Sequence, residues 1–352
     1  MTAPLVDAYD LVIFDLDGVI YLIDQPIPGA VEAVTRLAAE RRAVAYATNN
    51  ASRRATEVAE LLAGMGVPAT AAQVLTSAGA AAALLAERFP AGTPVLVVGS
   101  PALHAEVRAV GLEPVDRADR DPRAVIQGYG PQVSWGELAE ASVAIRAGAL
   151  WVATNTDRTL PSPRGPLPGN GALVAALQAA LGRDPDVIVG KPAPALFTTA
   201  ARAASRPLVV GDRLDTDIEG AVRAGMDSLL VLTGVTGAVE LLTAPTHRRP
   251  TYVAADLGGL FAPAETLRVS GPECGGWRAT VDGPGLRLDG DGAVVDALRA
   301  LCAAAWSSPE LIPRAGASAG QLPPVTAGSR EAEAVLHELG LVSEETAKFE
   351  QV

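Results

Sequence analysis

Short runs of apolar, often β-branched residues alternate with longer segments of helical period from about residue 10 to residue 262. Runs such as Leu208-Val209-Val210 show no polar alternation, which is typical of strands covered on both faces of a parallel sheet. This alternation predicts an α/β fold whose parallel strands are joined by right-handed crossovers. The expected strands span 11–15, 43–48, 95–99, 125–127, 150–154, 187–189, 208–212 and 228–233, and the expected helices span 29–40, 52–65, 77–88, 101–110, 134–147, 171–181, 194–204 and 216–224.

The pattern changes after residue 262, where prolines and glycines interrupt brief apolar runs. We expect a hairpin within 277–288 that turns at 282–285, a helix over 294–306 and a last amphipathic helix near 330–339. Residues 263–352 are therefore predicted to form a separate small α+β module. The module is faintly similar to a piece of an acetyltransferase fold. However, Ala317 stands where the Arg/Gln-x-x-Gly-x-Gly/Ala loop for acetyl-CoA needs a glycine in 314–320, so a structural or dimerising role is expected.

Composition restricts the classes of partner. The 28 Lys and Arg against 40 Asp and Glu give a formal net charge of -12, which argues against nucleic acids and anionic membranes. The two cysteines, Cys274 and Cys302, cannot form a disulfide framework and show no metal-ligand spacing. No apolar run approaches the roughly 18 residues that a membrane span needs. We therefore expect a cytoplasmic protein without membrane insertion, and homo-oligomerisation stays open.

Acidic and polar residues follow several of the expected strands. Asp15 and Asp17 come at the end of the first strand, followed by Gly18, and Thr48 and Asn49 end the second. Two of the later strands are likewise followed by charged residues: Lys191 comes after 187–189, and Asp212, Asp215 and Asp217 come after 208–210. Because ligands bind at the carboxyl ends of parallel strands, these residues form one candidate site.

Each element alone has a simpler structural explanation. An Asp after a strand is often a turn former or helix cap, Thr-Asn-Asn is commonly a cap, and most lysines are solvated. Asp215 and Asp217 compete for one capping role, so at least one of them is expected to be structural. Four such motifs, in this order and each at the carboxyl end of an expected strand, are hard to explain by capping alone. Their combination therefore favours a functional site.

The residue types suit hydrolysis of a phosphate monoester. A carboxylate nucleophile divides the reaction into two displacements through an aspartyl-phosphate, and Asp15 is the expected nucleophile. Asp15, the backbone carbonyl of Asp17 and Asp212 would hold Mg²⁺, which frees the Asp17 side chain for general acid and base catalysis. Lys191 would add positive charge, and Thr48 and Asn49 would bind the transferring oxygens.

These motifs resemble those of the haloacid dehalogenase superfamily of aspartate-dependent phosphatases. Asp15-Leu16-Asp17-Gly18-Val19, Thr48-Asn49-Asn50, Lys191 and the segment 211–217 match its four motifs in order. The resemblance covers about residues 9–262 and is closest to the branch with 4-nitrophenylphosphatases and phosphoglycolate phosphatases. It implies a Rossmannoid doubly wound core, formed by 9–78 and 186–262, with an α/β cap inserted at 79–185.

The same resemblance implies roles for further residues. Asp217 would orient the metal site, although an N-cap role is left open, and Asn155, Asp157 and Arg158 of the cap would face the pocket. The segment 168–171 is either part of this cap surface or only a turn that starts a helix. The loop after Asp212 would line the substrate pocket through four residues: Arg213, Leu214, Asp215 and Thr216.

The resemblance and the closing cap together imply a Mg²⁺-dependent phosphatase for a small phosphorylated metabolite. The alanine content and the C-terminal extension point to the actinobacterial glycerol-3-phosphate phosphatase type. Phosphoglycolate, pyridoxal phosphate and nucleotides are alternative substrates, since the motifs do not separate them. A non-catalytic regulatory module in which the acidic cluster only holds a metal is the alternative from another class.

Overall fold

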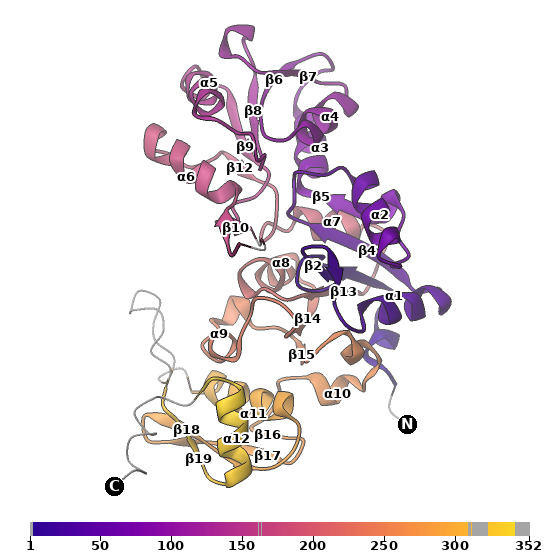
Figure 1. Cartoon of the computed structure of the whole chain (residues 1–352), viewed down its shortest axis with the longest axis vertical. Coiled ribbons are helices and arrows are strands. Elements are labelled where there is room, and N and C mark those ends of the chain that lie inside the picture. The colour runs from indigo at the N-terminus through magenta and orange to yellow at the C-terminus, as the bar shows by residue number, and fades with distance from the viewer. Residues whose placement is uncertain (1–2, 161, 163, 309–310, 312–322, 342–352) are drawn as a thin grey trace.

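The computed structural model describes residues 3–160, 162, 164–308, 311 and 323–341. Figure 1 shows an elongated molecule in which three regions, each containing a sheet, follow one another along the longest axis. The region with the six-stranded sheet lies in the middle, between a second α/β region and the C-terminal module.

The central sheet has six parallel strands in the order β15-β14-β13-β1-β4-β5. Its strands are buried on both faces, as the unbroken apolar runs predict. Val12 and Phe14 face the helices α1 (Ala30–Ala39) and α2 (Ala55–Gly64), whereas Ile13 faces α7 (Ala195–Ala200) and α8 (Glu219–Ala224). The strands are β1 (Leu11–Phe14), β4 (Ala43–Thr48), β5 (Val74–Thr76), β13 (Pro207–Gly211), β14 (Asp227–Val231) and β15 (Tyr252–Ala254).

A second parallel sheet of five strands, in the order β12-β9-β8-β6-β7, forms the region drawn at the top of Figure 1. Apolar clusters fill both of its faces, one beneath α3 and α4 and the other beneath α5 and α6. Strand β12 lies beyond residue 185, where the cap was expected to end, yet it pairs with β9 of this sheet. The elements are β6 (Pro94–Val98), β7 (Glu113–Val115), β8 (Ala124–Gln127), β9 (Leu150–Ala153), β12 (Val187–Ile188), α3 (Ser77–Arg88), α4 (Pro101–Ala109), α5 (Trp135–Arg146) and α6 (Asn170–Leu181).

The C-terminal module contains a four-stranded sheet in the order β16-β17-β18-β19, with a hairpin between β17 (Trp277–Asp282) and β18 (Gly285–Gly290) as expected. Helix α11 spans Val294–Trp306, the predicted range, and leads on to β19 (Val325–Ala327), which pairs with β18 in parallel. The remaining elements are β16 (Glu273–Cys274) and α12 (Arg330–Glu338).

One apolar cluster joins this module to the central sheet. Leu230 and Val253 of the sheet, Leu241 of α9 (Ala238–Leu242) and Leu298 and Leu301 of α11 all belong to it. The α/β fold, its parallel sheets and the small C-terminal module with antiparallel strands are confirmed.

Several element bounds differ from the expectation. Strands β5, β7 and β15, each of three residues, were not predicted. Helix α2 begins at Ala55 and not at Ser52, since the backbone N–H of Arg54 is capped by the Glu57 carboxylate at 2.6 Å. Helix α8 begins at Glu219, because Leu214–Ile218 forms a π-helical turn.

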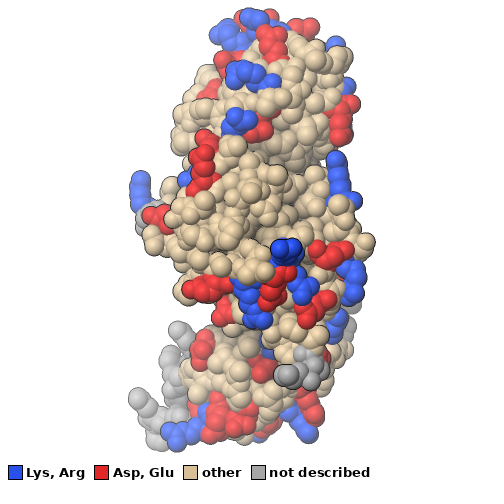
Figure 2. Space-filling view, turned by 90° about the vertical axis from the view of Figure 1, so that its right-hand side faces the viewer, with Lys and Arg blue, Asp and Glu red and all other residues tan. Residues whose placement is uncertain are grey.

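Charged side chains of both signs are interspersed on the face shown in Figure 2, among broad areas of other residues. Within the described ranges, no helix combines the length and the apolar character needed to cross a membrane.

Candidate active site

Three carboxylates from two neighbouring strands meet at one edge of the central sheet. Asp15 follows β1, whereas Asp212 and Asp217 follow β13, which pairs with β1 in parallel. One carboxylate oxygen from each of the three lies within 4.8 Å of the others, and all three side chains are buried. The register between the two strands therefore brings Asp15 and Asp212 together, and Asp217 joins them in the cluster.

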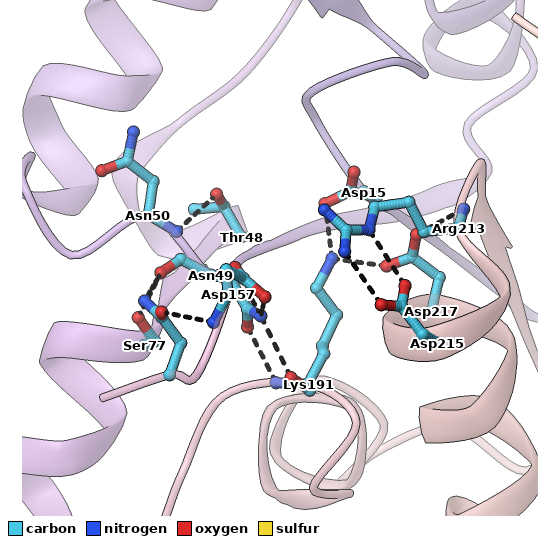
Figure 3. Close-up of polar contacts among 11 residues, drawn as sticks. Asp15, Thr48, Asn49, Asn50, Ser77, Asp157, Lys191, Arg213, Asp215 and Asp217 are labelled. Carbon is cyan, nitrogen blue, oxygen red and sulfur yellow. Dashed lines mark hydrogen bonds and ion pairs between the residues drawn. The ribbon is translucent and has the colours of Figure 1, made fainter. Parts of the chain in front are cut away.

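Lys191 joins this cluster from a different part of the fold. Its Nζ donates to Asp15 Oδ1 at 2.5 Å and to Asp217 Oδ1 at 2.6 Å (Figure 3). The expectation that Lys191 follows a strand of the same sheet is wrong, because β12 belongs to the five-stranded sheet. The loop between the two sheets carries the lysine to Asp15, which is 176 residues away in sequence.

Asn49 organises the loop after β4. Its side chain accepts from the backbone N–H of Lys191 at 2.8 Å and donates to the Lys191 carbonyl at 3.1 Å. Its backbone carbonyl accepts from Ser77 Oγ at 2.7 Å and from Asn155 Nδ2 at 2.6 Å. The neighbouring Thr48 hydroxyl accepts from the backbone N–H of Asn50, as Figure 3 shows. Asn49 thus links the central sheet to the loop that carries Lys191.

The surroundings of Asp212 fit a divalent cation. Its Oδ2 accepts from the backbone N–H of Val235 at 2.7 Å, whereas its buried Oδ1 has no hydrogen-bond partner within the described part of the chain. A Cβ at Gly18 would lie 2.5 Å from Asp212 Oδ2, and one at Gly234 would lie 2.0 Å from it. The two glycines thus allow the backbone to approach the Asp212 carboxylate closely, and carboxylate oxygens are the type of ligand that Mg²⁺ prefers.

The ionisation of the cluster supports the same interpretation. Burial raises the pKa of Asp15 well above its ordinary value, against the lowering effect of Lys191. Burial, followed by the charge of Asp217, raises the pKa of Asp212 to about 7. Burial opposes the charge on Lys191, but Asp15 and Asp217 outweigh it and raise the lysine pKa. One lysine does not balance three buried carboxylates, so a bound cation would stabilise the site.

A pocket of about 630 Å³ opens above these residues. Asp17 lies in it, and burial raises the pKa of the Asp17 carboxyl. The expected site residues that line the pocket are Asp15, Asp17, Thr48, Asn49, Lys191, Asp212, Arg213 and Thr216.

Three expected residues do not themselves line the pocket in the described part of the chain. Leu214 is buried in the apolar cluster shared with the C-terminal module, and Asp215 forms a two-pronged ion pair with Arg213, with both contacts at 3.0 Å. Asp217 Oδ2 accepts from the backbone N–H of Arg213 at 3.1 Å, which precedes it, so the side chain does not cap the following helix. Asp217 instead contacts Lys191 within the carboxylate cluster.

The five-stranded region contributes one side of the pocket. Asn155 and Asp157 line it, and Asn49 Nδ2 donates to both Asp157 oxygens at 3.2 and 3.1 Å. Arg158 is exposed and does not line the pocket in the part of the chain that the structure describes. Gly169 and Asn170 also line it, and a Cβ at Gly171 would lie 2.2 Å from the Thr156 carbonyl. The segment 168–171 is therefore packed against the pocket wall and also starts α6.

Sequence reasoning missed two groups of residues. Tyr21, Arg53 and Tyr129 line the pocket, but Tyr21 lies in the two-residue strand β2 (Tyr21–Leu22), the other two lie in loops, and none belongs to a recognisable motif. The second group runs from the end of β18 to the start of α11, where residues 287–293 read Arg-Leu-Asp-Gly-Asp-Gly-Ala and fit Arg-x-x-Gly-x-Gly. The candidate loop at 314–320 lies outside the described residues, and it follows α11, whereas a phosphate loop precedes its helix. Arg287 is already paired with Asp289 at 3.1 Å.

Family models match most of the chain. Residues 12–113 match the haloacid dehalogenase-like hydrolase model, and residues 188–260 match a second HAD-hydrolase-like model. Residues 274–341 match a GCN5-related N-acetyltransferase-like domain.

Individual relatives agree with these models. The D-glycerol 3-phosphate phosphatase of Mycobacterium tuberculosis is 48% identical over 311 residues, which cover 85% of this chain and 86% of the relative. Chronophin of Rattus norvegicus is 39% identical over 292 residues, which cover 76% of this chain and 93% of the relative.

Solved structures show the same similarity. The glycerol phosphate phosphatase of Mycobacterium tuberculosis in complex with magnesium superposes with a TM-score of 0.87 at 44% identity, covering 97% of this chain and 100% of that one. The 4-nitrophenylphosphatase of Thermotoga maritima gives a TM-score of 0.68 at 33% identity, covering 74% and 98%. Motifs, fold and relatives agree, and this chain therefore belongs to the haloacid dehalogenase-like hydrolase family, in the branch that holds these phosphatases.

Proposed function

We propose that this protein is a Mg²⁺-dependent phosphatase that hydrolyses a small organic phosphate monoester, with glycerol 3-phosphate as the preferred substrate. The observation that carries the proposal is the meeting of the Asp15, Asp212 and Asp217 carboxylates with Lys191 at the base of the pocket. Phosphoryl transfer needs a nucleophile with positive charge positioned around it. Here a carboxylate can act as the nucleophile, and Lys191 together with a cation held by the carboxylates can supply the positive charge.

Asp15 is the nucleophile in this proposal. Its carboxylate attacks the phosphorus atom, the bond from phosphorus to the leaving oxygen breaks, and an aspartyl-phosphate forms. Asp17 lies in the same pocket, and in this proposal it donates a proton to the departing alkoxide; burial raises its pKa, which favours this role. Lys191, Thr48 and Asn49 bind the phosphoryl oxygens, on which charge develops during the transfer.

The second displacement regenerates the enzyme. Asp17, now a carboxylate, takes a proton from water, and the water oxygen attacks the phosphorus of the aspartyl-phosphate. The acyl phosphate P–O bond breaks, so inorganic phosphate leaves and Asp15 returns to its starting form. The aspartyl-phosphate is shielded from bulk water by the region that contributes Asn155 and Asp157.

Asp15, Asp212 and the backbone carbonyl of Asp17 are the groups that would hold Mg²⁺, with Asp217 beside them. When bound, Mg²⁺ supplies positive charge that offsets the repulsion between a carboxylate nucleophile and a phosphate dianion. The magnesium complex of the similar Mycobacterium tuberculosis phosphatase supports this assignment.

Support for the substrate comes from the relatives and from the pocket. The relative that is 48% identical is a D-glycerol 3-phosphate phosphatase, and the pocket of about 630 Å³ suits a small metabolite. We therefore expect glycerol 3-phosphate to be hydrolysed faster than phosphoglycolate, pyridoxal phosphate and nucleoside monophosphates. The acidic composition and the free cysteines Cys274 and Cys302 support a cytoplasmic enzyme that does not act on nucleic acids.

The test measures phosphate release across these four classes of substrate with wild type and Asp15→Asn. We expect Asp15→Asn to keep its circular dichroism spectrum and its Mg²⁺ binding but to lose phosphate release, because an amide is a poor nucleophile. Asp24→Asn is the matched control, since Asp24 is an exposed carboxylate on a nearby loop. Unchanged turnover in Asp15→Asn would exclude the proposed nucleophile. Binding of Mg²⁺ by a wild type that releases no phosphate would favour a non-catalytic metal-binding module.

A further inference from the structure

The cations that line the active-site pocket differ in how they are engaged. Lys191 donates to Asp15 and Asp217, and Arg213 forms a two-pronged pair with Asp215. Both charges are therefore already partly neutralised by carboxylates of the protein. The third cation in the pocket lining is Arg53, which has no ion pair among the described residues.

Two successive arginines of the same loop have different environments. Arg54 reaches Glu106 of α4 at 2.9 Å, whereas the side chain of Arg53 is exposed at the pocket. The backbone before them is fixed, since Asn50 Oδ1 accepts from both the N–H and the hydroxyl of Ser52 at 2.8 and 2.7 Å. The loop thus holds the backbone of Arg53 at the pocket edge and leaves its guanidinium available.

Arg53 lines the same pocket as Asp17 and Tyr21. It acts on Asp17, where it lowers a pKa that burial raises, and on Tyr21. The principal charges acting on Asp15 are instead Lys191, Asp217, Asp212 and Asp17. In the proposed mechanism Asp17 protonates the leaving oxygen, so the pocket that Asp17 and Arg53 both line also receives the organic part of the substrate.

We propose that Arg53 is a substrate-binding residue whose guanidinium donates hydrogen bonds to a hydroxyl or carboxylate oxygen of the leaving group. This inference rests on the proposed phosphatase function. A guanidinium presents five N–H donors in a rigid fork, which suits two neighbouring oxygens such as those of a diol or a carboxylate. Arg53 therefore selects small phosphates that carry oxygen atoms on the organic moiety over phosphates with apolar leaving groups.

The test compares three substrates that share the phosphate and differ in the leaving group: glycerol 3-phosphate, n-propyl phosphate and phosphoglycolate. For Arg53→Gln we expect kcat/KM to fall about tenfold with glycerol 3-phosphate and with phosphoglycolate, mostly through KM, because a charged hydrogen-bond donor is lost. With n-propyl phosphate, which offers no such oxygen, we expect less than a twofold change. Arg53→Lys should lie between wild type and Arg53→Gln, because it keeps the charge and loses the fork.

Arg54→Gln is the matched control, because it removes the neighbouring arginine that is held by Glu106. Its effect should be the same for all three substrates, so the ratio between glycerol 3-phosphate and n-propyl phosphate should equal that of wild type. An equal loss with all three substrates in Arg53→Gln, or no loss with any, would overturn the inference. If wild type hydrolyses none of the three, the proposed function itself fails, which is a different result.

Discussion

Gly18 and Gly234 flank the carboxylate of Asp212, and their lack of side chains allows both residues to pack closely against it. Gly18 also has a backbone φ of 85°, which lies in the left-handed region that favours glycine. A Cβ at Gly234 would lie 2.0 Å from Asp212 Oδ2, closer than any real contact. The candidate metal site thus depends on two glycines, which have no side chain that could bind a metal or a substrate.

We expect Gly234→Ala to weaken Mg²⁺ binding and to lower kcat at least about tenfold, because the methyl group displaces the Asp212 carboxylate. Gly237→Ala is the control, since a Cβ there meets nothing within 4 Å. Isothermal titration with Mg²⁺ and phosphate-release kinetics measure the two effects. Equal Mg²⁺ affinity in both variants would show that Asp212 does not bind the metal.

At the scale of elements, the first residue of α3 positions the loop after β4. Ser77 is fully buried and donates to the carbonyl of Asn49, whose side chain in turn holds the backbone of Lys191. The sequence predicts the bounds of α3, but the pattern of hydrophobic residues does not show that its first hydroxyl supports the active-site loop. That contact depends on how the helix packs against the sheet.

Ser77→Ala should raise KM severalfold and lower the free energy of unfolding by about 1 kcal/mol, because one buried hydrogen bond is lost while Asn155 still donates to the Asn49 carbonyl. Ser134→Ala removes the N-cap of α5, whose hydroxyl accepts from Glu137 at 3.4 Å, and should cost a similar free energy. Urea unfolding and steady-state kinetics compare the two. An equal change of KM in both variants would assign the Ser77 effect to general destabilisation.

At the scale of the whole molecule, the C-terminal module is continuous with the core of the central region. Arg299 of α11 is buried, and it donates to the carbonyl of Val253 in β15 at 2.9 Å and pairs with Asp296. The expectation of a separate module from residue 263 rested on a change in composition. Composition describes the segment itself and not the surface against which it packs.

Arg299→Met should lower the free energy of unfolding by about 3 kcal/mol, because it leaves a largely buried carboxylate and a strand carbonyl without their partner. Arg278→Met is the control, as Arg278 forms an exposed pair with Glu273 that contributes less than about 1 kcal/mol. Urea denaturation followed by circular dichroism provides the measurement. A loss in Arg299→Met no larger than in the control would contradict the role of Arg299 in joining module and core.

The sequence by itself determined the alternation of strands and helices, the residue types of the four motifs and the family to which they belong. These properties are local, because burial on both faces imposes unbroken apolar strands and phosphoryl chemistry requires carboxylates, a lysine and small polar residues. It therefore predicted that Asp15, Asp17, Asp212 and Lys191 form one site, and all four line the same pocket.

The tertiary structure decided which side chain meets which partner. It brought Lys191 to Asp15 through a loop that leaves the five-stranded sheet, and it turned Asp217 toward Lys191 and Asp215 toward Arg213. Among the residues that the structure describes, it gave Arg54 an ion pair and Arg53 none. The side chains of neighbouring loop residues can point in different directions. Packing against elements far apart in the sequence selects the direction that each side chain takes. That selection depends on contacts between segments far apart in the chain, which the pattern of a single sequence does not contain.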